Sequence, residues 1–105
     1  MINSYHKVIK EDFIKLWDTN VVKDWVKKGR AHSLLQGKIL RCQVKQLKRL
    51  GIPNLGIPRI KTSSKSVDGS LLEMSRTHLV VTMDKVLARD IRKLGGNVLH
   101  PCFIS

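Results

Sequence analysis

The sequence predicts an α/β fold with a small, mainly parallel sheet. Short apolar runs rich in β-branched residues alternate with segments whose apolar residues follow helical spacing, and this alternation is typical of parallel sheets. The clearest run is Leu-Val-Val at 79–81, which is followed by Asp84 and then by a helical pattern that ends at Gly95. A second apolar run, residues 13–17, ends at Asp18 in the same way. We therefore expect two buried strands that each lead into an acid and a helix.

The middle of the chain is expected to be helical. Residues 21–26 have an apolar face and a charged face, so they predict a helix directly after the first strand. The apolar residues of 38–50 also keep helical spacing, and Gly51 is a natural stop. We therefore expect one helix over the whole of 38–50.

The next segment, residues 52–58, contains two prolines and a glycine and cannot form a regular helix. We expect a loop there, with a short edge strand around residues 57–60. A short helix with Asp68 at or near its start follows, ahead of the strand at 79–81. Residues 97–99 indicate a last strand, which ends before Pro101.

The net charge is strongly positive. Lys and Arg number 20 against 8 Asp and Glu, which gives a formal charge of +12 at pH 7. Such a balance indicates a polyanionic partner, most often nucleic acid. Because the basic residues are spread along the chain, we expect a charged face on a folded body and not a basic tail.

The sequence also bounds the compartment and the domains. No apolar run approaches the length of a membrane span, and the first residues do not resemble a signal peptide, so we expect a cytoplasmic protein with no membrane contact. Cys42 and Cys102 match no metal-ligand spacing, and we expect them to be reduced. We expect an N-terminal extension over residues 1–12 and a single domain over residues 13–105.

Three acids are candidates for a common site. Asp18 and Asp84 follow strands, and Asp68 opens the helix that precedes the second of these strands. The ends of parallel strands can be neighbours at one edge of a sheet. Carboxylates gathered there would repel one another unless a cation lay among them, and Mg²⁺ or Mn²⁺ so held can assist phosphodiester hydrolysis. The alternative is that each aspartate only caps a helix.

Several short motifs resemble those of PIN-domain ribonucleases. Asp-Thr-Asn-Val at 18–21, after an apolar strand, resembles the opening motif of that family. Val-Asp-Gly-Ser-Leu-Leu at 67–72 and the strand ending in Thr-Met-Asp at 82–84 are similar to its closing half. Leu-Gly-Gly-Asn-Val-Leu at 94–99 resembles its last helix-to-strand turn. The resemblance covers roughly residues 13–101.

The resemblance implies a compact three-layer PIN-like domain and a metal-dependent endoribonuclease, of the toxin type or acting in RNA processing. It implies that Asp18, Asp68 and Asp84 are the catalytic and metal-binding carboxylates, with Mg²⁺ or Mn²⁺ as the cofactor. Asn20 and Thr82 would support them by hydrogen bonds.

Two features depart from the family pattern. Many members carry a further acid in the middle helix, where this chain has Gln46, which can still support the site by coordination or a hydrogen bond but brings no charge. The chain is also short between Gln46 and Asp68, which fits a compact member and leaves open a degenerate fold that binds RNA without cutting it.

The expected partner is RNA, bound by basic side chains. These are Lys45, Lys48, Arg49, Lys61, Lys65, Lys85 and Arg89. The main alternative is a non-catalytic nucleic-acid-binding module on the same fold. A third is a basic subunit that assembles with an acidic protein, as a toxin nuclease and its antitoxin do, and a homodimer stays open.

Overall fold

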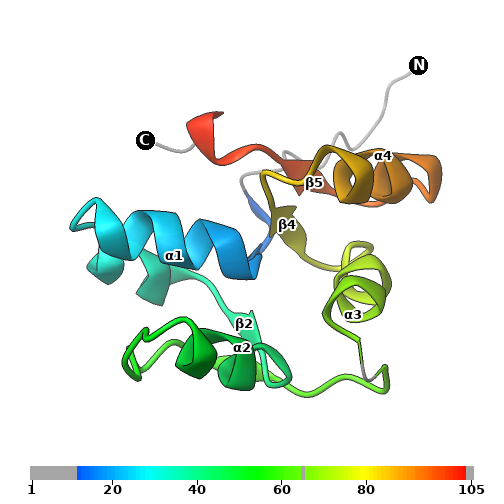
Figure 1. The fold of residues 1–105 in the computed structure, drawn as a ribbon. Helices are drawn as coiled ribbons and strands as arrows, with labels where there is room; N and C mark the ends of the chain where they lie inside the picture. Colours follow the sequence, from blue (N-terminus) through cyan, green and yellow to red (C-terminus); the bar gives the residue numbers. More distant parts are fainter. Residues whose placement is uncertain (1–11, 65, 104–105) are drawn as a thin grey trace.

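The computed structural model describes residues 12–64 and 66–103 (Figure 1). The expected α/β class with small, mainly parallel sheets is confirmed. The predicted extension over residues 1–12 lies, except for Asp12, outside the described residues, so the domain boundaries stay a prediction. In chain order the elements are β1 (Lys15–Trp17), α1 (Thr19–Lys27), the 3₁₀ helix η2 (Ala31–Gln36), β2 (Ile39–Leu40), α2 (Gln43–Arg49), β3 (Arg59–Ile60), α3 (Val67–Met74), β4 (Leu79–Val81), α4 (Lys85–Lys93), β5 (Val98–Leu99) and the 3₁₀ helix η3 (Pro101–Phe103).

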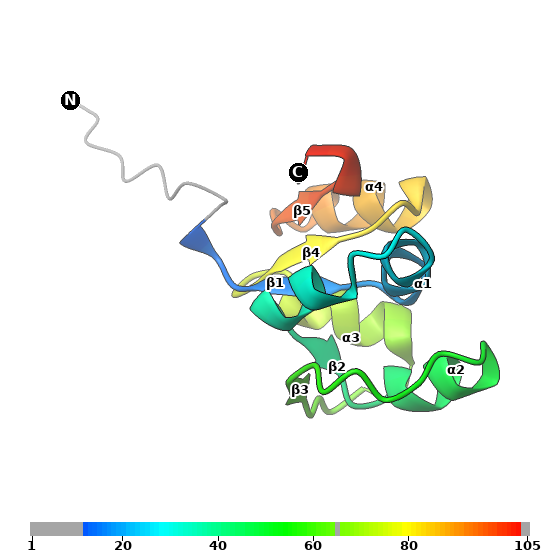
Figure 2. The same ribbon diagram turned by 90° about the vertical axis from the view of Figure 1, so that its left-hand side faces the viewer.

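The strands form two parallel ladders that meet at β1. One ladder has the order β1-β4-β5, and the other pairs β2 with β3. Lys38, directly before β2, forms a parallel bridge with Leu16, and its N–H donates to the Lys15 carbonyl at 2.8 Å. The strands therefore follow one another as β3, β2, β1, β4 and β5, from bottom to top in Figure 2.

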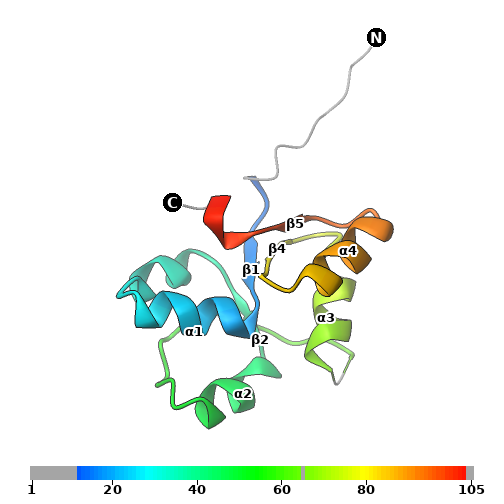
Figure 3. The ribbon, with the colours of Figure 1, turned by 45° about the horizontal axis from the view of Figure 1, so that its top comes forward.

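Helices cover both faces of the sheet. Neighbouring residues of a strand point to opposite faces, so the buried apolar residues of β1 and β4 form a core on each side. Trp17 and Val81 belong to one buried cluster, with side chains from α1, η2 and α2. Leu16 and Val80 belong to the second cluster, with side chains from α3 and α4. Figure 3 shows α1 and α2 on one side of the strands and α3 and α4 on the other. The fold thus has three layers.

The single helix expected over residues 38–50 is wrong in its first part. Ile39 and Leu40 form β2, and the helix begins only at Gln43. The N–H of Ile39 donates to the Pro58 carbonyl at 2.9 Å, and the N–H of Arg41 donates to the Ile60 carbonyl at 2.8 Å. Both β2 side chains are buried. Two adjacent apolar residues fit a turn of helix as well as a two-residue strand, so their spacing could not distinguish the two. Of the edge strand expected around residues 57–60, only Arg59 and Ile60 form a strand, which is β3.

The helix ends follow capping rules, with one correction. Asp18 and Asp84 are the N-caps of α1 and α4, and their carboxylates accept backbone N–H groups of the first turn. Asp68 is not a cap, because Ser66 caps α3 and accepts the Gly69 N–H at 3.0 Å. Gly95 ends α4 as expected, since its φ of 74° is a left-handed conformation that favours glycine.

The helices are short. α1 and α4 have 9 residues each and bury one apolar face against the sheet. Within the described residues, every helix falls short of the length and apolar character that crossing a bilayer would require. Cys42 and Cys102 are both free thiols.

Candidate active site

The order of the strands creates a crevice beside β1. The chain leaves β1 toward β2 on one side, whereas β4 lies on the other side, so the strand order reverses between β1 and β4. In parallel α/β sheets, ligands bind outside the carboxyl ends of the strands at such a point. Asp18 directly follows β1, and Asp84 follows β4. Because α3 leads back to the start of β4, its first turn with Asp68 lies at the same edge.

These acids meet in one cleft of about 390 Å³, which we call the acidic cleft. It contains all three of the predicted carboxylates and both of the predicted amide side chains. The lining residues are Asp18, Thr19, Asn20, Gln46, Arg49, Leu50, Val67, Asp68 and Asp84. Arg49 is the only cationic residue of this lining. The sequence-based expectation that the acids lie together therefore agrees with the geometry.

Asp18 is the buried member of the cleft. Only 8% of its surface is exposed. Its Oδ1 accepts the Thr19 N–H at 2.8 Å, and its Oδ2 accepts the Thr82 hydroxyl at 2.6 Å. Burial raises the pKa of the Asp18 carboxyl, and the negative charges of Asp68 and Asp84 raise it further, although the two hydrogen bonds oppose the change. The ionised carboxylate thus lies in a site that disfavours its charge.

Thr82 connects the two strand-end acids. Its side chain is buried, and its hydroxyl donates to Asp18 and accepts the Asp84 N–H at 3.0 Å. Asp84 uses Oδ1 to accept the N–H groups of Val86 and Leu87. Its Oδ2 has no protein partner among the described residues, so one oxygen of this exposed carboxylate is free to bind a ligand. The placement of Thr82 fits its expected supporting role.

Sequence reasoning missed Gln43, which holds this edge of the sheet together. The side chain is fully buried. Its Nε2 donates to the Trp17 carbonyl at 2.8 Å and to the Thr19 hydroxyl at 3.1 Å, while its Oε1 accepts the Leu40 N–H at 2.6 Å. The Thr19 hydroxyl in turn donates to Gln46 Oε1 at 2.8 Å. A glutamine three residues after the apolar pair Ile39-Leu40 was the only signal in the sequence.

The acidic cleft continues into basic grooves toward α2, and on its other side into a groove in which two lysines are balanced by Asp24 and Asp84. Toward α2 it shares Arg49 and Asp68 with a groove that reaches Lys45, and that groove shares Lys45 with another that reaches Arg41 and Lys61. In the opposite direction, Asn20 and Asp84 are shared with a groove lined by two further lysines. These are Lys23 and Lys27. Sequence reasoning named Lys45, Arg49 and Lys61 but missed Arg41, Lys23 and Lys27.

The other predicted RNA-binding residues lie elsewhere. Lys48 lines a separate apolar pocket. Lys85 and Arg89 are exposed on α4 and do not line the grooves described above, and Arg89 lies 3.5 Å from the carboxylate of Asp90. Lys65 is outside the described residues.

The donor set of the acidic cleft fits a hard divalent cation. Carboxylate and amide oxygens are the ligands that Mg²⁺ prefers, and a cation would stabilise the charge of Asp18, whose pKa is raised by burial and, to a smaller extent, by the charges of Asp68 and Asp84. Among residues 12–64 and 66–103, no three acidic, histidine or cysteine side chains converge closely enough to hold one ion together. An ion in this cleft would therefore keep part of its water shell, as protein-bound Mg²⁺ usually does.

No protein-family model matches the chain, and a search of curated proteins finds no match.

The Gln43→Leu variant should lower the free energy of unfolding by about 2 to 4 kcal/mol, because it leaves the Leu40 N–H and the Trp17 carbonyl buried without partners. Urea denaturation measures the loss. Gln36→Leu makes the same change at an exposed position and should alter stability little. Equal effects of the two variants would contradict the structural role of Gln43.

The Asp18→Asn variant should gain stability relative to the wild type as pH rises. The pKa of Asp18 is higher in the folded state than its ordinary value of 3.8. The stability that the protonated carboxyl contributes to the wild type is therefore complete below about pH 3.8 and is lost as pH rises through the pKa of the folded state. The variant does not titrate at this position. Denaturation in EDTA from pH 3.5 to 7 measures the difference, and a difference that stays constant would show that the pKa is not raised.

Proposed function

We propose that this chain is a metal-dependent endoribonuclease of PIN-like type. The observation that carries this proposal is the meeting of Asp18, Asp68 and Asp84 in one cleft at the point where the strand order reverses. Basic grooves extend from that cleft toward α2, and lysines also line the groove on its other side, together with Asp24 and Asp84. Such an arrangement suits a phosphodiester backbone, because cations can hold phosphates on both sides of an acidic centre.

The residues of the acidic cleft divide into binding and positioning groups. When bound, Mg²⁺ or Mn²⁺ would supply an activated water and stabilise charge on the leaving oxygen. Asp84 Oδ2 and Asp68 present free carboxylate oxygens to the cleft, and Thr82 orients the carboxylate of Asp18. Gln46, where the resemblance implies an acid, adds no charge and accepts the Thr19 hydroxyl.

A second candidate is a non-catalytic RNA-binding module. The capping geometry favours it, because Asp18 and Asp84 each stabilise a helix without any metal. Asp68 separates the two candidates, since it caps no helix and its exposed carboxylate makes no hydrogen bond or ion pair within the described residues. As the acid in the first turn of α3 it favours the helix dipole, but that role needs no partner and leaves its carboxylate oxygens available to a ligand in the cleft.

Cleavage of a mixed single-stranded RNA should require Mn²⁺ or Mg²⁺ and stop in EDTA. Asp84→Asn should reduce the cleavage rate more than about 100-fold, the upper range for residues that only support a metal ligand. Asparagine keeps the N-cap, so the fold should persist. Gel analysis of the RNA products measures the rate.

The matched control is Asp90→Asn, which makes the same change on α4 away from the acidic cleft and should leave the rate within about twofold of the wild type. If the wild type leaves the RNA intact and Asp84→Asn binds it as tightly as the wild type does, the proposal of an enzyme fails. The non-catalytic binding module then takes its place.

Replacing Lys45 and Lys61 together by glutamine should weaken single-stranded RNA binding and reduce its salt dependence. The slope of log affinity against log salt should fall by about 1.4, because each lost phosphate contact removes about 0.7. Fluorescence anisotropy with Asp84→Asn in EDTA measures binding without cleavage.

The control pair is Arg92→Gln with Lys93→Gln, which removes the same charge from the far end of α4. An equal change in slope for both pairs would mean that RNA responds only to the net charge and not to the grooves.

A further inference from the structure

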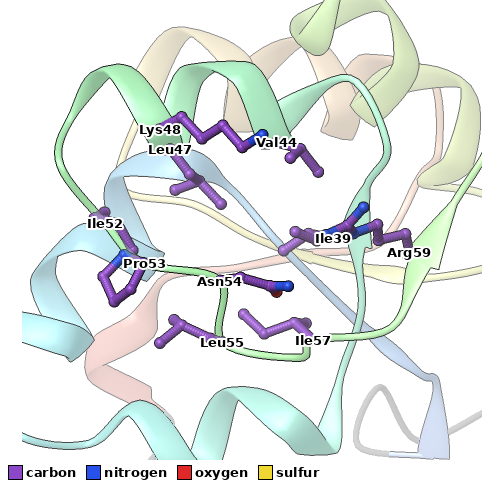
Figure 4. Close-up of a pocket in the computed structure, with 10 residues that line it drawn as sticks. All are labelled: Ile39, Val44, Leu47, Lys48, Ile52, Pro53, Asn54, Leu55, Ile57 and Arg59. Atoms are coloured by element: carbon purple, nitrogen blue, oxygen red, sulfur yellow. The ribbon is translucent and has the colours of Figure 1, made fainter.

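A second concave site lies between α2 and the segment that connects it to β3. It is a pocket of about 250 Å³ and shares no lining residue with the acidic cleft. We call it the aliphatic pocket. Its lining residues are Ile39, Val44, Leu47, Lys48, Ile52, Pro53, Asn54, Leu55, Ile57 and Arg59 (Figure 4).

The walls of the aliphatic pocket belong to the core. Ile39, Leu47, Ile52 and Ile57 are buried members of the cluster on that face of the sheet, with Val44 and Leu55 packed against it. No aromatic residue lines the pocket, so it offers no surface on which a nucleobase could stack. Its shape and chemistry instead suit an aliphatic group.

Hydrogen bonds hold the connecting segment in place at both ends. The Ile52 N–H donates to the Leu47 carbonyl at 3.0 Å, and the Pro58 carbonyl accepts the Ile39 N–H at 2.9 Å. Within the segment, Asn54 Oδ1 accepts the Gly56 N–H at 3.0 Å, at a glycine whose φ is 72°. The pocket is therefore formed before any ligand binds, which reduces the entropy cost of binding.

Two cationic residues line the aliphatic pocket. Lys48 and Arg59 are exposed, and neither forms an ion pair with another described residue. Because Asn54 uses Oδ1 within the segment, its Nδ2 remains as a donor. Figure 4 shows the nitrogen atoms of these three side chains around the aliphatic residues. No acid lines the pocket, so its polar groups are all suited to an anion.

We propose that the aliphatic pocket binds a small aliphatic carboxylate. Binding sites for small molecules are mostly apolar, with a few polar groups that fix the orientation of the ligand. Here the hydrocarbon chain packs against Val44, Leu47 and Ile57, and the carboxylate pairs with Lys48 and Arg59. The volume lies just below the usual range of about 300 to 1,000 Å³, so the ligand is short.

Hexanoate is the probe that tests this proposal, with acetate, hexan-1-ol and hexylamine beside it. Titrations followed by ¹H–¹⁵N NMR in EDTA, without RNA, make the result independent of any nuclease activity. Hexanoate should bind saturably and shift amides around the aliphatic pocket, hexan-1-ol should bind there more weakly, and hexylamine should not bind. Acetate should produce none of these shifts, because it has no chain to bury.

Variants separate the charge from the cavity. Lys48→Gln and Arg59→Gln should each weaken hexanoate binding about 5- to 20-fold and leave hexan-1-ol binding unchanged. Lys45→Gln, on α2 but outside the aliphatic pocket, is the matched control and should change neither. Val44→Phe should remove the binding of both probes, and unchanged shifts elsewhere in its spectrum would establish that it folds.

Three results would overturn the proposal. The first is equal affinity for hexanoate and hexan-1-ol, which would mean that the cations contribute nothing. The second is the same set of shifts with acetate, which would indicate general anion binding to a basic surface. The third is the absence of saturation by hexanoate.

Discussion

The fold at the acidic cleft depends on the buried amide of Gln43. This side chain joins the carboxyl end of β1, the end of β2 and the start of α2. Strands as short as β2 have little pairing energy of their own. A buried amide that satisfies both an N–H and a carbonyl replaces what a longer ladder would supply. The position of Thr19, and through it Gln46, follows from this contact.

The placement of the acids has an electrostatic cost that the rest of the molecule offsets only in part. Asp18 is ionisable, almost fully buried and close to two further carboxylates. Hydrogen bonds from Thr19 and Thr82 stabilise its charged form, and the cationic Arg49 lies in the same cleft. The N-cap that Asp18 provides for α1 does not need a charged side chain, since asparagine caps a helix as well, so the burial of a carboxylate there is a cost beyond what capping requires. The conflict is the kind that functional sites retain.

The sequence predicted the elements whose signals are local. β1 and β4 are apolar runs followed by acids, and the acids lie together because parallel strands place their carboxyl ends at one edge. β2 was missed because a strand of two residues has no periodicity that distinguishes it from a helical turn. The hydrogen bonds of Gln43 and the place of Lys23 in one groove with Asp84 depend on the approach of distant segments, which no local pattern encodes. The resemblance to PIN-domain ribonucleases rests on the motifs and stays a proposal.

One helix forms a wall of both concave sites. Gln46 and Arg49 of α2 face the acidic cleft, whereas Val44 and Lys48 line the aliphatic pocket. A rigid helix of 7 residues cannot shift at one of these sites and remain fixed at the other. Where a ligand at one site favours one position of α2, thermodynamic linkage would couple its binding to the other site. A ligand of the aliphatic pocket that prefers one position of α2 changes affinity at the acidic cleft by some factor, and a ligand of the acidic cleft changes affinity at the pocket by the same factor.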